Sequence, residues 1–228
     1  MRTRGILSIA IIAILLGSLI PITNDIELDD VENKLFANSE PELLIQAGTA
    51  TGHVNGTGIG ATPDGWIIAG DTRNSLTFGS TQLQATSPYN TQLDADTYVA
   101  ALDDQGNWLW AVMPDATQGL LLMQTMEVSM AGDAYIAGLI FGTVIFGSQP
   151  SSPALTATNG AGDGFIAKID PTGQWVWATS FNTAGGTGNY SLIAGVAESI
   201  NGNVIVSGVH KGSTDFGGIT EVSPDDSN

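Results

Sequence analysis

The chain contains no cysteine. This absence excludes disulfide bonds, thiolate metal sites, cysteine nucleophiles and lipid anchors attached to cysteine. Positive charge is also scarce, because the 228 residues hold six Lys and Arg against 23 Asp and Glu. All 23 carboxylates follow Asn24. The only basic residues in that part of the chain are Lys34, Arg73, Lys168 and Lys211, so it carries a charge of 4 − 23 = −19. Such a charge keeps a protein soluble and repels phosphate backbones, which argues against nucleic acid as a partner.

The N-terminus combines a basic start with a long apolar run. Two arginines within the first four residues precede an uncharged stretch, residues 5–22, and acidic residues begin at Asp25. This order predicts a hydrophobic helix in residues 1–24, either a cleaved signal peptide or an uncleaved membrane anchor. In both cases the rest of the chain is exported, and it is either secreted or attached to the outer face of the cytoplasmic membrane or the cell surface. Residues 25–40 are acidic and lack periodicity, which predicts a flexible spacer.

After the spacer, the sequence repeats with a long, nearly constant period. A glycine-bounded aliphatic block closes at Gly70, Gly138 and Gly208, which are 138 − 70 = 68 and 208 − 138 = 70 residues apart. A Phe-Gly dipeptide follows each block, at 78–79, 146–147 and 216–217. A third block occurs twice, at 96–110 and 163–177, a step of 163 − 96 = 67 residues. Such a period predicts one supersecondary unit stacked on copies of itself.

Each repeat has the pattern of two β-hairpins with tight turns. In the first repeat, strands 57–62 and 66–70 flank one turn, and strands 96–103 and 107–112 flank another. In the second copy of the latter hairpin, the turn is Pro-Thr-Gly at 171–173. Apolar residues occur on both faces of the strands, and simple alternation places Trp175 and Trp177 on one face with Val176 on the other. The 20-odd residues between the two hairpins of a repeat contain the Phe-Gly dipeptide, and we expect them to form a long loop.

These patterns predict an all-β fold built of β-propeller blades, each a four-stranded antiparallel sheet, preceded by the N-terminal hydrophobic helix. Apolar residues on both faces suit a blade, because each blade lies between two neighbours. The predicted partial propeller covers residues 41–228 and is divided into a strand (43–48), two full blades (53–117 and 118–186) and a half blade (187–228).

The repeated blocks resemble the SBBP-type β-propeller repeats of exported bacterial and archaeal proteins. The resemblance rests on the order Gly-Asn/Asp–aliphatic–Gly, then Phe-Gly, then Asp-x-Phe-Ile-Ala-Lys-Ile-Asp-x-x-Gly-x-x-x-Trp, and covers about residues 43–228. It implies a secreted or surface propeller joined to other extracellular modules, with no catalytic residue set to carry over. The inter-hairpin loops are longer here than is usual in that family.

The repeats number too few for a closed ring, which uses about four to eight blades. We therefore expect a truncated sequence or a broken reading frame, or alternatively a short chain that assembles with others into one ring. Unpaired blade edges also predict self-association.

Two sets of residues could carry chemistry. The first resembles the docking repeat of quinoprotein propellers, although its Asp-to-Gly step is one residue short; it comprises Asp103, Gly106 and Trp110, and Asp170, Gly173 and Trp177. Tryptophans that fill the space between blades are the stronger interpretation. The second is a set of strand-start carboxylates that could bind a cation, namely Asp94, Asp96, Asp163 and Asp215. The dense spacing of a calcium loop is missing, so we interpret these as turn and strand caps.

The only imidazoles are His53 and His210, and no nucleophile can be matched to either, so we interpret them as surface-loop residues. Glycosylation sequons begin at Asn55 and Asn189, in predicted loops. No catalytic, cofactor-binding or metal-binding residue is assigned, no cofactor is expected, and the ligand-binding residues are unknown.

Two functional hypotheses follow. In the first, the chain is a non-enzymatic exported or cell-surface propeller module, a binding or structural scaffold for an extracellular protein or glycan. The long polar loops 80–94 and 148–162 on a rigid scaffold favour it. In the alternative, the chain is a fragment of an extracellular propeller enzyme, either quinoprotein-like or polysaccharide-degrading. An enzyme requires convergent charged residues, and basic residues are scarce here.

Overall fold

The computed structural model describes residues 54–73, 75–86, 96–158, 160–184, 186 and 188–223. This part of the chain forms sixteen β-strands and no helix, which confirms the all-β prediction. The hydrophobic segment 1–24, the spacer 25–40 and the expected strand 43–48 lie outside the described residues. Among the described residues, no helix is long and apolar enough to cross a membrane.

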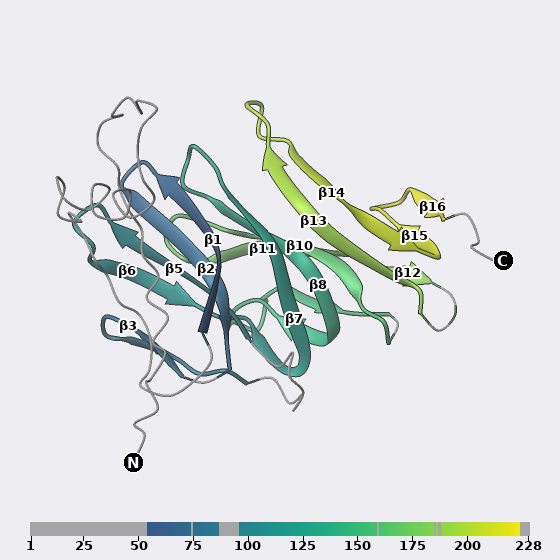
Figure 1. Cartoon of the computed structure of the whole chain (residues 1–228), viewed down its shortest axis with the longest axis horizontal. Helices are drawn as coiled ribbons and strands as arrows, with labels where there is room; N and C mark the ends of the chain where they lie inside the picture. Colours follow the sequence, from purple (N-terminus) through teal and green to yellow (C-terminus); the bar gives the residue numbers. More distant parts are fainter. Residues whose placement is uncertain are drawn as a thin grey trace, which may run out of the picture.

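Three main sheets follow one another in sequence order (Figure 1). The first sheet consists of β1 (Val54–Thr62), β2 (Gly65–Thr72), β5 (Asp96–Asp103) and β6 (Trp108–Val112), antiparallel in that order. The second sheet repeats this arrangement with β7 (Asp115–Val128), β8 (Ala134–Ile145), β10 (Asp163–Ile169) and β11 (Trp175–Phe181). The third sheet contains β13 (Tyr190–Glu198) and β14 (Val204–Lys211). The predicted hairpin strands are thus confirmed within the described residues.

The closing glycine of each repeat faces a β-bulge in the preceding strand. In the second sheet, Met123 lies opposite Gly138 and Thr125 opposite Ala137, so one residue between them has no partner. The same irregularity occurs at the matching place in the first and third sheets. The bulge brings a backbone carbonyl to the position that a side chain would need. An added Cβ would lie 1.8 Å from the Asn55 oxygen at Gly70, 2.1 Å from the Leu122 oxygen at Gly138 and 2.1 Å from the Leu192 oxygen at Gly208. Steric exclusion therefore explains why glycine recurs in all three copies.

The sheets pack face to face, so the second sheet is covered on both sides. One buried cluster joins the first two sheets, with Ile67 and Val99 on one side and Ile136 and Phe165 on the other. A second cluster joins the opposite face of the second sheet to the third; its buried members are Tyr135, Ala137, Ile166 and Ile193. This stacking agrees with the prediction of apolar residues on both faces. The sheets do not close into a ring or barrel within the described part of the chain.

The predicted orientation of the tryptophans is wrong, because a second bulge interrupts the alternation. Trp177 lies opposite Lys168 and Trp175 opposite Ile169, which leaves Val176 as the extra residue. Trp175 therefore packs into the cluster between the first and second sheets, whereas Trp177 packs into the cluster between the second and third. A bulge shifts the register by one residue and so exchanges the faces of all residues beyond it.

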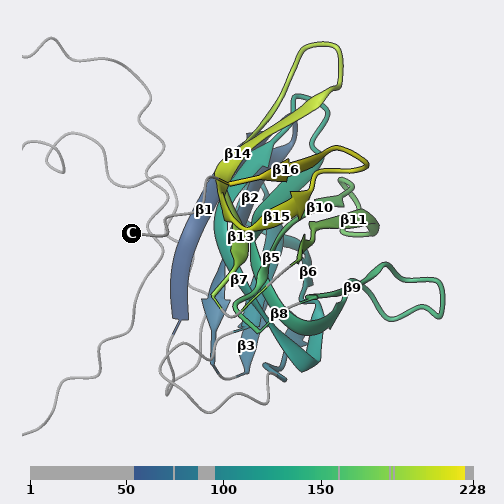
Figure 2. The same ribbon diagram turned by 90° about the vertical axis from the view of Figure 1, so that its right-hand side faces the viewer.

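The segments predicted as long loops contain short strands. They are β3 (Leu76–Phe78) with β4 (Thr81–Leu83) in the first repeat and β9 (Ala154–Thr156), which pairs with the end of β8, in the second (Figure 2). In the third repeat, β15 (Ser213–Asp215) and β16 (Thr220–Val222) form a small separate sheet with β12 (Thr183–Ala184), which comes from the end of the second repeat. The buried phenylalanine of the Phe-Gly motif anchors the segments of the first two repeats. Phe78 packs edge-on against Trp108 at 4.8 Å between centroids, and Phe146 against Trp175 at 5.0 Å.

Candidate functional site

Three positions that are apolar between the first two sheets become polar between the second and third. Ile67 pairs with Ala101 in the first sheet, and at the equivalent place in the second sheet Tyr135 pairs with Lys168. The third position is Val128 in the second sheet and Glu198 in the third. The two are equivalent, because Val128 lies opposite the first residue of β8 and Glu198 lies opposite the first residue of β14. Residues that depart from the repeat are candidates for a function that the scaffold alone does not require.

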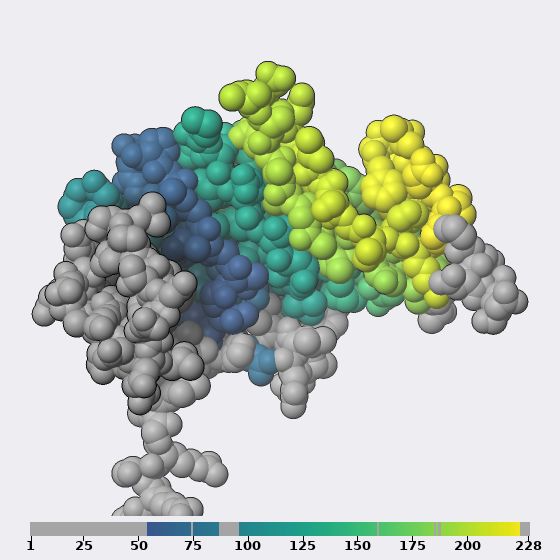
Figure 3. All heavy atoms as spheres, turned by 45° about the horizontal axis from the view of Figure 1, so that its top comes forward, coloured from purple at the N-terminus to yellow at the C-terminus, as the bar shows by residue number. Residues whose placement is uncertain are grey.

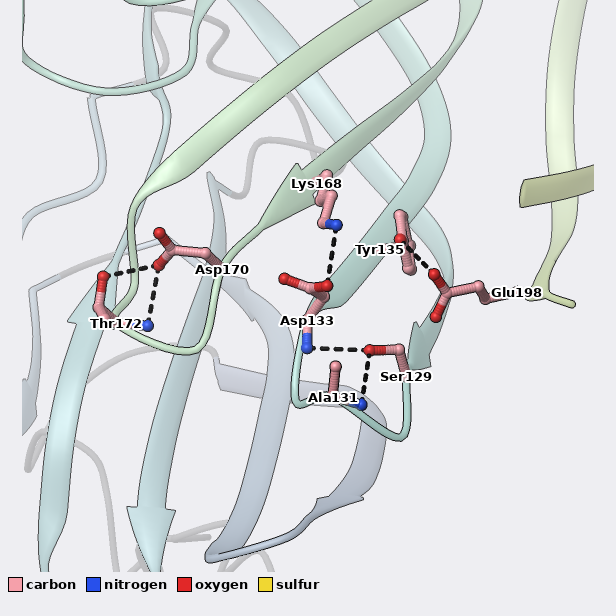
Figure 4. Close-up of polar contacts among 8 residues, drawn as sticks. All are labelled: Ser129, Ala131, Asp133, Tyr135, Lys168, Asp170, Thr172 and Glu198. Atoms are coloured by element: carbon pink, nitrogen blue, oxygen red, sulfur yellow. Dashed lines mark hydrogen bonds and ion pairs between the residues drawn. The ribbon is translucent and has the colours of Figure 1, made fainter. Parts of the chain in front are cut away.

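These residues form a polar cluster of two neighbouring pairs on the face of the second sheet that packs against the third (Figure 4). The Lys168 Nζ lies 2.8 Å from Oδ2 of Asp133 and 5.4 Å from the centre of the Tyr135 ring. The Tyr135 hydroxyl donates a hydrogen bond of 3.0 Å to Oε1 of Glu198, which links the second sheet to the third. The backbone N–H of Asp133 donates to Oγ of Ser129, which fixes the turn that carries this carboxylate.

The protonation states of this cluster suit a structural link. The hydrogen bond with Asp133 raises the pKa of Lys168 above its ordinary value, although partial burial opposes the shift. Burial raises the pKa of Tyr135, and its hydrogen bond with Glu198 adds to the effect. At neutral pH the amine and the phenol therefore both keep their protons. A lysine acting as a base or nucleophile near neutral pH needs a lowered pKa, so the cluster has the wrong electrostatics for that chemistry.

The residues that resemble a quinoprotein docking repeat form turns and inter-sheet contacts. The Asp103 carboxylate accepts the backbone N–H groups of Gln105 at 3.0 Å and Asn107 at 2.7 Å. Asp170 caps the equivalent turn of the second sheet in the same way. Trp110 Nε1 donates a 2.8 Å hydrogen bond to the Pro171 carbonyl, so the first sheet is tied to the turn of the second. This geometry supports the interpretation of the tryptophans as packing between sheets.

The strand-start carboxylates do not converge on one point. Asp163 is buried and accepts the backbone N–H of Thr158 at 2.6 Å and of Thr183 at 2.8 Å, so it ties β10 to two other segments. Asp96 is buried at the start of β5 and accepts from Thr86. The exposed Asp215 accepts from Gly218, at 2.7 Å, and Asp94 lies outside the described residues. Within the described part of the chain, no group of three or more His, Asp or Glu residues is arranged to hold a metal ion.

The remaining predicted positions differ partly from expectation. His210 lies within β14 rather than in a loop; it is half-buried, and its Nδ1 is 3.1 Å from Oγ1 of Thr214. Asn55 lies in β1, so the prediction of a loop is wrong there, whereas Asn189 immediately precedes β13. His53 lies outside the described residues. His210 and Asn55 lie in strands rather than loops because the backbone pairing of β14 and β1 continues beyond their apolar residues into their polar ends.

The most exposed apolar face belongs to the third sheet. Ile67 and Tyr135, at equivalent places in the first two sheets, are 1% and 2% exposed, whereas Ile205 at the same place in β14 is 62% exposed. Within the described residues β14 pairs only with β13, while β2 and β8 have partners on both sides. The yellow-green surface of β13 and β14 is open in Figure 3. We call the side of β14 that faces away from β13, over residues 204–211, the open edge.

The sequence interpretation missed the polar cluster, whereas the unpaired blade edge expected from the half blade agrees with the pairing of β14 with β13 alone among the described residues. The available signal for the cluster was the alignment of the repeats, in which Lys168 replaces Ala101. Comparison with protein-family models gives no match, and neither does a search of the curated proteins. The resemblance to SBBP-type repeats is therefore taken up below as a proposal.

Proposed function

We propose that the chain is part of an exported or cell-surface β-propeller module of the SBBP type, which serves as a non-enzymatic binding or structural scaffold. The observation that carries this proposal is the repetition of one unit. The first two sheets share the same order of four main strands, the same two bulges and the same edge-on Phe–Trp contact, and they pack face to face. The first two strands of the third repeat continue the stack. Stacking through sheet faces is how propeller blades are assembled.

The polar cluster and the charge distribution support a scaffold. The Tyr135–Glu198 hydrogen bond links the second sheet to the third, and the protonated Lys168 pairs with Asp133 within the second sheet. The exposed face of β14 offers apolar side chains and a strand edge, which are features of a protein-binding surface. The excess of carboxylates disfavours nucleic acid and anionic lipid as ligands, which leaves an extracellular protein or glycan.

Export is tested by fractionation of cells that produce the chain with a C-terminal epitope tag. We expect the full chain outside the cytoplasm and a variant without residues 1–24 inside it. N-terminal sequencing of the exported product distinguishes a cleaved signal peptide from a retained anchor through residues 5–22. A full chain that remains in the cytoplasm would contradict the proposed function.

A further inference from the structure

We propose that the contact between the second sheet and the third repeat is a joint that opens and closes in water, whereas the contact between the first two sheets stays closed. We call the contact between the first two sheets the first joint. The second joint is the contact of the second sheet with the third repeat, in which β13 lies against β7 and β8 (Figure 1). Opening of the second joint is independent of export and of any ligand.

A serine in the second joint occupies the place of a leucine in the first. Leu121 and Ser191 are equivalent, because each lies opposite the second residue after a closing glycine. Leu121 is 1% exposed and belongs to the apolar cluster of the first joint. The Ser191 hydroxyl is equally buried, but it accepts a 2.8 Å hydrogen bond from the Gly164 N–H and donates to the Phe181 carbonyl, both in the second sheet. A hydrogen-bonded contact therefore replaces an apolar one.

A pair of hydroxyls in the third repeat likewise replaces an apolar pair. Thr214 and Val144 each precede the phenylalanine of a Phe-Gly motif by two residues, and Thr183 and Ala116 each follow the acidic residue at a strand start by 20, since 183 − 163 = 116 − 96 = 20. Val144 and Ala116 belong to the apolar cluster of the first joint. Thr183 and Thr214 are both fully buried, and their hydroxyl oxygens form a hydrogen bond of 3.0 Å. The Thr183 N–H also donates to the Asp163 carboxylate of the second sheet at 2.8 Å.

The closed second joint satisfies its polar groups. Tyr135, Lys168 and Glu198 are also polar where the first joint is apolar, as described above. Tyr135 donates to Glu198 across the joint at 3.0 Å, and Lys168 lies 2.8 Å from Asp133 on the face that the joint covers. Buried polar groups with such partners do not carry the cost of an unmade hydrogen bond. The closed state is therefore stable although its contacts are polar.

The two joints differ more strongly in the open state. Opening of the first joint would expose Leu121, Val144 and Ala116 to water, which the hydrophobic effect opposes. At the same places in the second joint, opening exchanges hydrogen bonds within the protein for hydrogen bonds with water, and the net change in free energy is small. Position for position, the second joint therefore gains less from closure. The difference lies in single positions and is independent of the number of strands in the third sheet.

Polar contacts between packed elements can instead serve to fix their register. Interfaces between parts that move relative to one another are generally more polar than permanent ones, which favours an opening joint. The two roles predict opposite effects of restoring apolar residues. An opening joint becomes tighter when its hydroxyls are replaced, whereas a register-fixing joint becomes looser.

The chain has no cysteine, so one introduced thiol reports on one joint. Ala137 in the second joint and Ala69 in the first are matched positions, since each precedes a closing glycine and both are fully buried. The purified full-length Ala137→Cys and Ala69→Cys variants are treated with dithiobis(nitrobenzoate) under native conditions, and the rate of thiol labelling is measured. We expect Ala137→Cys to react about tenfold faster or more, with a weaker dependence on urea than global unfolding shows, because only the joint opens.

Restoration of apolar residues tests the cause of the opening. Thr183→Val combined with Thr214→Val, added to Ala137→Cys, should slow labelling about tenfold, because the closed state then gains apolar contacts that water cannot replace. Thr220→Val, at an exposed position in β16, is the control and should leave the rate unchanged.

Equal labelling rates for the two cysteine variants would overturn the proposal, as would labelling that occurs only through global unfolding. An unchanged rate in the double valine variant would contradict it too, since the opening would then not arise from the polar positions. Faster labelling in that variant would show that the hydroxyl pair fixes the register instead. If either cysteine variant fails to fold, Ile166→Cys and Val99→Cys, which lie opposite Ala137 and Ala69, form a second matched pair.

Discussion

Replacement of Gly138 by alanine tests whether the β-bulges impose glycine on the repeat. The new Cβ would lie 2.1 Å from the Leu122 carbonyl oxygen, and neither group can withdraw without breaking the pairing of β7 with β8. Overpacking typically costs about 1–3 kcal/mol, and a backbone clash this close belongs at the upper end, offset by about 0.4–1 kcal/mol from the reduced entropy of the unfolded chain. A net loss of about 2 kcal/mol lowers the melting temperature of a protein of this size by roughly 4–8 °C.

Gly160→Ala is the matched control, because a Cβ at Gly160 would meet no atom within 4 Å. It should leave the melting temperature unchanged or raise it slightly through the same unfolded-state entropy. Both variants are compared with the unaltered full-length chain by circular dichroism during thermal unfolding. If Gly138→Ala melts within about 1 °C of the control, the bulge yields easily and steric exclusion does not explain the recurrent glycine.

Three further outcomes test contacts within and between the sheets. Trp110→Phe removes the hydrogen bond to Pro171 and should lower the free energy of unfolding by about 1 kcal/mol in urea titrations; an unchanged value would show that the bond adds nothing. Burial acts to raise the pKa of Asp170, but hydrogen bonds from its own turn outweigh this and lower it, so its stabilising effect is present above about pH 3.9 and is lost as the pH falls through the lowered pKa. Asp170→Asn should therefore lower the melting temperature at pH 7 more than at pH about 2.5, and an equal loss at both would contradict the assignment. Lys168→Met should cost about 1 kcal/mol or less, because its ion pair with Asp133 is partly exposed, and the loss should shrink in 1 M salt, where such pairs are screened.

The hairpins could be predicted from the sequence because their determinants are local. A turn such as Asp170-Pro-Thr-Gly173 needs only its own residues: the aspartate accepts backbone N–H groups, and the glycine adopts φ +84°. The orientation of Trp177 could not be predicted in the same way. Trp175-Val-Trp177 has the pattern of simple alternation, and the bulge at Val176 becomes apparent only from the pairing with β10. The β-propensity of a segment does not show which strand pairs with it or where a bulge interrupts the pairing.

The candidate sites were hidden for a different reason, since their residues are ordinary when taken singly. Lys168 is a strand residue like any other until it is aligned with Ala101, and its partner Asp133 comes from another strand connection. Similarly, nothing in Phe216-Gly217 distinguishes it from the earlier Phe-Gly motifs. Only the absence of a neighbouring indole around Gly217 separates them, and that is a property of the packed structure.

In this chain the closing glycines, which meet their own sheet, are preserved, whereas some of the positions that meet the next sheet vary. Gly70, Gly138 and Gly208 each face a carbonyl of the same sheet, and all three are glycine. Ile67 and Tyr135 face the following sheet and differ in chemistry, and Ile205 at the equivalent place in the third sheet is exposed. In the third repeat the equivalent position holds an exposed isoleucine, on a strand that pairs only with β13 within the described residues.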